Sequence, residues 1–230
     1  MAKLPQKGLN RAKGLYENRD LMARKLKAEG KKIVGYLCCQ VPLEPLTALG
    51  LVPYRITGDA RQPIARADAY LETIMCPFVR SCFDLALAGK YDFLDCLVLP
   101  HSCDTVERLY PIWNYYLKPS YTYFLNVPHM SYPSSRAFFR AELANFISTL
   151  EEWTGAKISE GSLRQATQIH NENRALLRQT YELRKQKPPL LSSAETLQLL
   201  VAGMVSPVEE HNQILRDALQ EIRGRRVAGK

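Results

Sequence analysis

The sequence predicts an α/β protein: a small, doubly wound parallel sheet of about four strands, followed by a helical segment. Short apolar segments that end near Pro or Gly alternate with helical patterns through the first 133 residues. This alternation is typical of strands joined by right-handed helical crossovers. Residues 134–226 contain no convincing strand pattern. No apolar run approaches the ~20 residues that a membrane-spanning helix needs, so no membrane partner is expected.

The first half of the chain begins with a charged segment, residues 9–29. Its pattern predicts one helix that ends at Gly30. Each expected strand is apolar or aromatic and is bounded by turn residues. The expected strands are 31–39, 51–57, 93–100 and 121–128. The expected helices of this half are 42–50, 65–75, 77–89 and one that begins after residue 100.

The second half is read as helices alone, at 134–155, 158–187, 194–204 and 206–224. Gly155 and Gly224 are natural helix stops, and the prolines after Lys187 break the longest pattern. We therefore divide the chain into a leading helix (1–30), an α/β domain (31–133) and a helical domain (134–230).

The net charge of +8 is concentrated at the two ends of the chain. Residues 1–32 carry +7 and residues 223–230 carry +4, whereas the 190 residues between them carry −3. A nucleic-acid footprint usually covers one face of a folded domain, so no nucleic-acid partner is expected. The N-terminus lacks the apolar stretch of a secretory signal, and we expect a cytoplasmic protein.

The six cysteines all lie between Cys38 and Cys103. Surplus core cysteines would be scattered, and a secreted disulfide framework is usually denser and shorter. The clustering indicates metal, cluster or thiol chemistry. Because there is no C-x-x-C pair, a ribbon-type zinc site and thioredoxin-like redox chemistry are both disfavoured.

The carboxyl ends of parallel strands form the usual ligand edge of a doubly wound sheet. Cys38 and Cys39 end the first expected strand, Cys103 follows the third, and Cys76 precedes Pro77 at a helix N-cap. Helix N–H groups favour the thiolate form that binds metal. Soft donors at one sheet edge suit an iron–sulfur cluster.

Other positions keep simpler interpretations. Cys96 lies inside an apolar strand and Cys82 inside a helix, so both are expected in the core. Cys38 and Cys39 alternate, so one of them should point away from the site. Glu44 is either an acid/base group beside the site or a carboxylate favoured by the helix dipole. His101 either reaches the site or caps a turn.

Three motifs, taken together, resemble the 2-hydroxyacyl-CoA dehydratase / benzoyl-CoA reductase subunit family. They are GYLCCQVPLEPLTALGLVPYR, MCPFVRSCFDLA and LPHSCDTVERLYPIW, in the family's order and spacing. The pattern is a Cys four residues before a Pro, then Glu and A-x-G-x-x-P, then Cys-Pro and, after a strand, Cys-Asp. The helical half continues the likeness, so the resemblance covers roughly residues 30–226.

The resemblance implies a 4Fe-4S cluster held by three cysteines, with one iron open. Cys76 and Cys103 match the ligand motifs, Cys38 matches the first family cysteine, and Glu44 matches the glutamate near the open iron. It further implies an acyl-CoA substrate, a second homologous subunit, and an ATP-dependent iron–sulfur activator that supplies one electron. That electron converts the thioester to a ketyl radical, which expels the adjacent hydroxyl.

Family subunits are longer, and their second α/β domain usually supplies a further cysteine. We therefore expect a fragment or short form without that domain. The leading interpretation is an iron–sulfur subunit of a 2-hydroxyacyl-CoA dehydratase. The alternatives are a benzoyl-CoA-reductase-like or electron-transfer cluster subunit, and a cluster-free scaffold domain.

Overall fold

The computed structural model describes residues 7–225 of the chain, and these form two compact units. The sheet unit comprises residues 30–159. The helical unit comprises residues 1–29 together with 160–230, of which 7–29 and 160–225 are described.

The sheet unit is built on four parallel strands, which confirms the predicted fold class. The strands are β1 (Ile33–Tyr36), β2 (Val52–Arg55), β3 (Cys96–Pro100) and β4 (Tyr121–Leu125). Their spatial order is β2-β1-β3-β4, and every neighbouring pair is parallel. The chain runs outward from β1 to β2, then crosses back past β1 to β3. The topological switch point therefore lies between β1 and β3.

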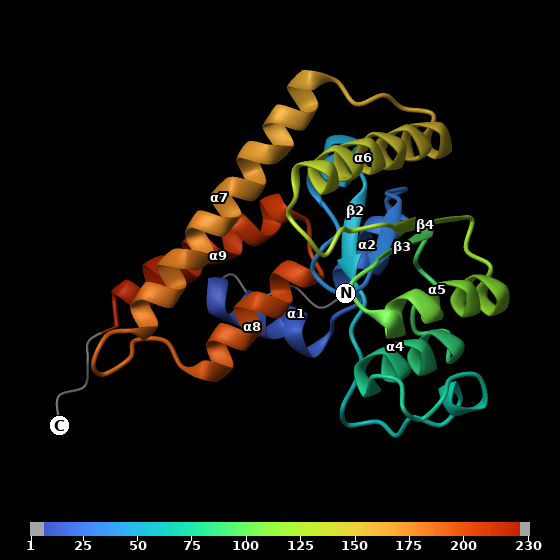
Figure 1. Cartoon of the computed structure of the whole chain (residues 1–230). Coiled ribbons are helices and arrows are strands. Elements are labelled where there is room, and N and C mark those ends of the chain that lie inside the picture. The colour runs from blue at the N-terminus through green and yellow to red at the C-terminus, as the bar shows by residue number, and fades with distance from the viewer. Residues whose placement is uncertain (1–6, 226–230) are drawn as a thin grey trace. The chain divides into compact units, whose positions relative to one another are not determined.

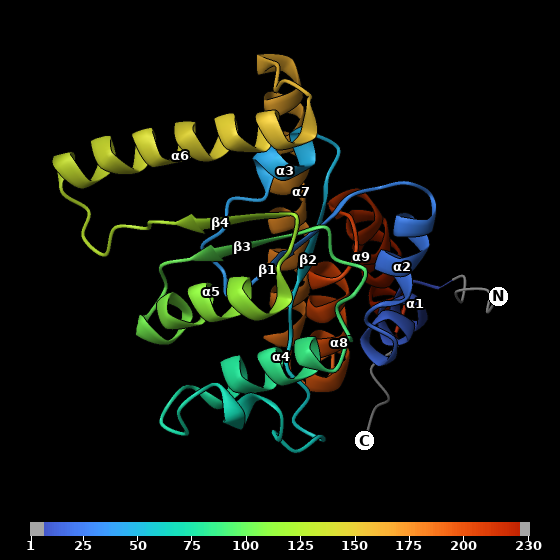
Figure 2. The same cartoon turned by 90° about the vertical axis from the view of Figure 1, so that its right-hand side faces the viewer.

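Helices cover both faces of this sheet. On one face lie α4 (Pro77–Leu87) and α5 (Asp104–Leu117), and on the other lie α3 (Glu44–Ala48) and α6 (Pro133–Thr154) (Figures 1 and 2). The core under α3 and α6 is continuous, and it includes Val34, Val98, Phe146 and Leu150. Cys96 is buried in the same core, as predicted.

Two predicted helices differ from the observed elements. The segment 9–29 forms two helices, α1 (Gly8–Glu17) and α2 (Leu21–Ala28), because Asn18 and Asp20 interrupt it. Asn and Asp side chains compete with the helical backbone for hydrogen bonds. The segment 65–75 forms only the 3-10 turn η1 (Ala67–Ala69). Its first N–H groups bind a carboxylate of α4 rather than a helical ladder.

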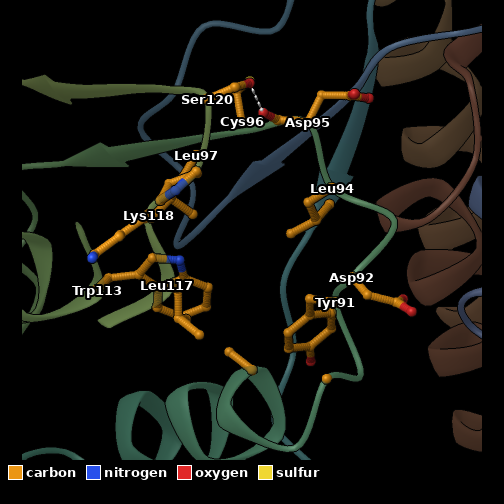
Figure 3. Close-up of a pocket in the computed structure, with 13 residues that line it drawn as sticks. Tyr91, Asp92, Leu94, Asp95, Cys96, Leu97, Trp113, Leu117, Lys118 and Ser120 are labelled. Atoms are coloured by element: carbon orange, nitrogen blue, oxygen red, sulfur yellow. Dashed lines mark hydrogen bonds between the residues drawn. The ribbon is translucent and has the colours of Figure 1, made fainter. Parts of the chain in front are cut away.

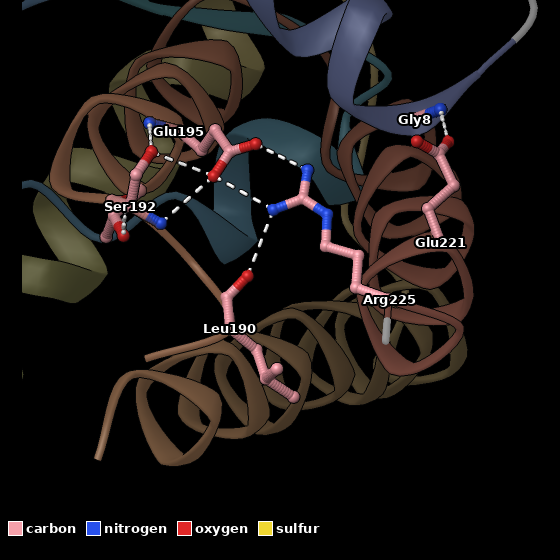
Figure 4. Close-up of polar contacts among 7 residues, drawn as sticks. Gly8, Leu190, Ser192, Glu195, Glu221 and Arg225 are labelled. Carbon is pink, nitrogen blue, oxygen red and sulfur yellow. Dashed lines mark hydrogen bonds and ion pairs between the residues drawn. The ribbon is translucent and has the colours of Figure 1, made fainter. Parts of the chain in front are cut away.

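The helical unit is made of α1 and α2 with α7 (Glu160–Arg184), α8 (Ser193–Met204) and α9 (Val208–Arg223). The helix α1 packs on α8 and α9, and α9 also contacts α7 and α8. A capping box starts α8: Ser192 Oγ accepts from the Glu195 N–H, and the Glu195 carboxylate accepts from the Ser192 N–H and from Arg225 (Figure 4). None of the described helices is long and apolar enough to cross a membrane.

Contacts group the chain differently from the divisions drawn after residues 30 and 133. Residues 134–159 belong to the sheet unit, because α6 hydrogen-bonds to β4. Tyr121 shares a hydrogen bond with Thr149 across 2.8 Å, and Tyr123 donates to Glu142 over 3.1 Å. The leading segment belongs to the helical unit. The sequence-based division into independently folding domains stays a prediction.

A buried histidine in the helical unit predicts acid-sensitive stability. His211 is 2% exposed, its Nδ1 lies 2.8 Å from Asn173 Nδ2, and its Nε2 lies 3.0 Å from the Leu199 carbonyl. Burial lowers the pKa of His211 to about 4, although the bond to Leu199 opposes this. The native ring stays neutral, whereas the unfolded ring is protonated below its ordinary pKa of about 6.5.

The free energy of unfolding should therefore fall as the pH drops from about 6.5 towards 4. Between pH 7.5 and 5 we expect a loss of about 2 kcal/mol from this group, measured by chemical denaturation. The exposed His129 offers a matched control, because His129→Gln should leave the pH dependence unchanged. An unfolding free energy that is flat over this range would contradict the assignment.

Candidate functional site

The segments that carry the predicted ligands leave the carboxyl edge of the sheet, after β1, β2 and β3. Cys38 lies two residues after β1, and Cys103 lies three residues after β3. These two positions flank the topological switch point. Cys76 ends the long segment that follows β2. Ligands of doubly wound sheets bind in the crevice at this switch point, so the fold brings the segments to a suitable place.

Two of these cysteines occupy helix N-caps. Cys76 caps α4 and Cys103 caps α5, and the thiols of both are exposed. In neither case does the side chain accept a hydrogen bond from the helix. The first turn of α4 contains no acidic residue, so the positive end of that helix dipole is not offset there. Cys76 therefore has an exposed thiol beside uncompensated backbone donors.

Cys38 is half-buried and has a φ of 60°. Such a left-handed conformation is uncommon outside glycine and costs backbone energy. Strain of this kind concentrates at functional sites. Because β1 ends at Tyr36, Cys38 and the exposed Cys39 lie in a turn. Strand alternation does not apply to these two cysteines.

Cys82 lies in α4 and is fully buried. Burial raises the pKa of the Cys82 thiol, and charges on Cys38 and Cys76 raise it further, whereas Arg55 lowers it. Arg55 is the last residue of β2 and aligns with Tyr36, the last residue of β1, so it lies at the sheet edge from which the Cys38 turn leaves. Cys103 stands at the adjoining end of β3.

The donor set fits an iron–sulfur cluster in its chemistry. All six cysteines lie in the described part of the chain and are free thiols, and thiolates are the usual ligands of such clusters. Among residues 7–225, no three His, Cys, Asp or Glu side chains lie close enough to hold a single metal ion. A four-iron cluster is a larger body than an ion, so its ligands stand further apart.

Glu44 is the first residue of α3 and is half-buried. It follows the Cys38 turn, and α3 then carries the chain over the α6 face of the sheet (Figure 2). Pro45 occupies the first turn, as expected. The position is that of a first-turn carboxylate. A shared location of Glu44 with the cysteines stays a prediction.

His101 lies at the end of β3, beside the Cys103 segment. Its Nε2 is 3.2 Å from a Glu107 carboxylate oxygen, and its ring meets that of His129 edge-on at 5.1 Å. His129 follows β4. The two histidines therefore connect the carboxyl ends of β3 and β4.

The segment after β2, residues 57–75, is held against α4 and will be called the clasped loop. Figures 1 and 2 show it looping beneath α4. Arg80 donates to Asp68 and to the Thr73 carbonyl, and Ser81 Oγ accepts from the Asp59 N–H over 3.0 Å. Asp84 Oδ1 accepts from three consecutive N–H groups, those of residues 65–67. Side chains of α4 thus fix the loop that leads to Cys76.

Asp84 accepts three of the hydrogen bonds that hold this loop. Although burial opposes its charge, the three N–H bonds and Arg66 hold the pKa of Asp84 below its usual value. Asp84→Ala would leave the buried N–H of Ala67 and the two part-buried N–H groups of residues 65 and 66 without this acceptor, so we expect a loss of about 2–4 kcal/mol in unfolding free energy. Glu72→Ala, at an exposed position of the same loop, is the control. Equal stability of the two variants by urea denaturation would contradict this role.

Two pockets in the sheet unit lie at opposite edges. One, of about 550 Å³, is formed by the clasped loop and the first turns of α4, next to Cys76. The other, of about 440 Å³, lies at the amino edge, where β3 and β4 begin, and Trp113, Leu117 and Lys118 line it (Figure 3). Pro77 and Phe78, which directly follow Cys76 in the chain, line the first pocket.

Comparison with known proteins identifies the family of this chain. Residues 38–230 match the family described as HGD-D, 2-hydroxyglutaryl-CoA dehydratase, D-component. The chain belongs to this family. The match begins at Cys38 and includes every candidate site residue named above.

This HGD-D chain also resembles individual proteins. It is 33% identical over 215 residues to a benzoyl-CoA reductase subunit of Thauera aromatica, covering 91% of this chain and 55% of that protein. It is 26% identical to lactoyl-CoA dehydratase subunit beta of Anaerotignum propionicum, covering 86% and 52%. It is 26% identical to (R)-2-hydroxyglutaryl-CoA dehydratase subunit beta of Acidaminococcus fermentans, covering 87% and 54%. The chain spans about half the length of these relatives, and each is named as a subunit.

Two features of this HGD-D chain were not found from its sequence. Arg55 aligns with Tyr36 across the β1–β2 pair, and a cation at the last position of a strand could have been noticed. No local sequence pattern indicates the clasped loop. It depends on contacts between Asp84 and N–H groups that lie 17 to 19 positions earlier in the chain.

Proposed function

We propose that the chain is an iron–sulfur subunit, or part of one, of a 2-hydroxyacyl-CoA dehydratase. In this proposal Cys38, Cys76 and Cys103 hold a 4Fe-4S cluster at the carboxyl edge of the sheet, within residues 31–133. The observation that carries it is the position of Cys38 and Cys103 on either side of the topological switch point. Membership in the HGD-D family supports the acyl-CoA substrate class.

When bound, the cluster would supply single-electron chemistry and an open Lewis-acidic iron to the thioester. The residues of this chain would bind the thioester substrate and orient it. The first-turn N–H groups of α4, at Cys76, and the Arg55 guanidinium, at the end of β2, would supply positive charge to the thiolates. Glu44 would hold or move the proton exchanged with the substrate during elimination.

A second candidate is a subunit of the benzoyl-CoA reductase type, which reduces or transfers electrons without dehydration. The specific observation in its favour is the 33% identity to the reductase subunit, against 26% to two dehydratase subunits. Both candidates share the cluster and the acyl-CoA substrate. They also share the proposed partners, a second homologous subunit and an ATP-dependent iron–sulfur activator, and a cytoplasmic location.

The test is turnover by the anaerobically prepared complex with its activator and ATP. The dehydratase proposal predicts that a 2-hydroxyacyl-CoA is converted to an enoyl-CoA. One electron should support many turnovers, because it is returned after each dehydration. Reduction of an aromatic acyl-CoA without dehydration would establish the second candidate. No conversion of either thioester by a cluster-loaded complex would contradict both.

A further inference from the structure

We propose that the pocket beside Cys76 receives an uncharged, apolar acyl group, preferably an aromatic one, and rejects an acyl group that ends in a carboxylate. The inference rests on the proposed function, because it takes the ligand to be an acyl-CoA thioester. It goes further by naming the acyl class and the residues that select it.

The size and lining of the pocket suit a small apolar group. Its volume of about 550 Å³ falls within the range of small-molecule sites. Apolar groups dominate its wall, with Ala60, Ile64, Pro77 and Phe78 contributing. The Phe78 side chain is 39% exposed, so an incoming ring can cover its free surface. Aromatic pairs gain energy from such contact beyond the area that they bury.

The charge of the pocket wall disfavours a carboxylate on the acyl group. The other described residues that line the pocket are Gly58, Asp59, Gln62 and Ser81. Among the described lining residues, Asp59 is therefore the one that carries a charge, and it is an anion. Its partner Arg61 contacts both carboxylate oxygens of Asp59, at 3.0 and 3.2 Å, and its side chain is 86% exposed. A carboxylate at the tip of an acyl chain would lose water here without gaining a cation from the wall.

Hydrogen bonds and close contacts hold the pocket wall in place. Ser81 Oγ accepts from the Asp59 N–H, and a side-chain carbon at Gly58 would lie 2.7 Å from the same Oγ. Arg80 and Asp84 hold the rest of the clasped loop. A wall fixed in this way keeps its shape without a ligand and can discriminate between acyl groups. Pro77 and Phe78 line the pocket and directly follow Cys76, the N-cap of α4, so its wall is continuous in the chain with a proposed cluster ligand.

The experiment measures binding by the anaerobically purified full chain with isothermal titration calorimetry. The three probes are 3-phenylpropionyl-CoA, glutaryl-CoA and CoA itself. We expect 3-phenylpropionyl-CoA to bind about tenfold or more tightly than glutaryl-CoA. Phe78→Ala should remove roughly that advantage and leave the affinity for CoA unchanged.

Ala60→Trp supplies a second variant, because residue 60 is exposed and a large side chain there fills the pocket without disturbing the core. It should also abolish the preference for 3-phenylpropionyl-CoA. Ile74→Ala is the matched control, since Ile74 is 88% exposed on the clasped loop and does not line the pocket. It should bind all three probes as the parent chain does.

The outcomes separate the two proposals. Glutaryl-CoA binding as tightly as 3-phenylpropionyl-CoA, or an unchanged preference in Phe78→Ala and Ala60→Trp, would overturn the acyl-class inference while the proposed function stands. A chain that binds none of the three probes would count against the proposed function and the inference together.

Discussion

Cys76→Ser or Cys103→Ser should abolish the proposed cluster or convert it to another form. Oxygen is a harder donor than the thiolate that iron–sulfur clusters require, and each cysteine stands at a helix start, without a side-chain capping role that serine would replace. The measurement is iron and acid-labile sulfide content, with the visible absorption spectrum, for each anaerobically purified variant.

The chain offers matched controls. Cys96→Ser changes a thiol that is 1% exposed in the core, so the spectrum should remain intact even if stability falls. Cys39→Ser changes an exposed thiol next to Cys38, and it should retain the cluster that Cys38→Ser loses. Full iron content in Cys76→Ser would show that the ligand assignment is wrong.

Glu44→Gln is expected to lower turnover by about 100- to 10,000-fold, the usual range for general acid–base catalysis. The substitution keeps the shape of the side chain and removes its ability to exchange a proton. Glu44 is not among the proposed ligands, so cluster content should not change. The assay is turnover per cluster in the complete complex.

A purely structural Glu44 would behave differently. As a carboxylate at the first position of α3, it would stabilise the helix dipole by only about 0.3–1 kcal/mol, with no effect on rate. Unfolding measurements on the same variant therefore separate the two roles. Unchanged turnover with a small loss of stability would leave Glu44 a structural carboxylate.

Much of the fold could be predicted from the sequence, because the buried strands carry strong local signals. Continuous apolar residues indicate β1 and β3, while prolines and glycines mark where helices begin and end. Gly155, for example, has the positive φ of 71° that a helix C-cap favours. These elements fold as their local patterns indicate. The alternation of strands and helices predicts that the strands of the sheet are parallel.

The differences arise where distant groups override a local pattern. Residues 65–75 have a helical composition, yet Asp84 binds the N–H groups that would start the helix. The pocket beside Cys76 has the same origin, because Ser81 and Arg80 fix the loop that forms its wall. A sequence pattern reports neighbours along the chain, so it could place Cys76 at a helix start but could not reveal the pocket next to it.

We propose that this chain holds a 4Fe-4S cluster through cysteines at the carboxyl edge of its sheet. The most direct test of this proposal is iron and acid-labile sulfide analysis of the chain, purified anaerobically or reconstituted with iron and sulfide. We expect about four iron and four sulfide per chain, with loss of both in a Cys38→Ser/Cys76→Ser/Cys103→Ser variant that remains folded. A folded parent chain that contains neither iron nor sulfide after reconstitution would contradict it.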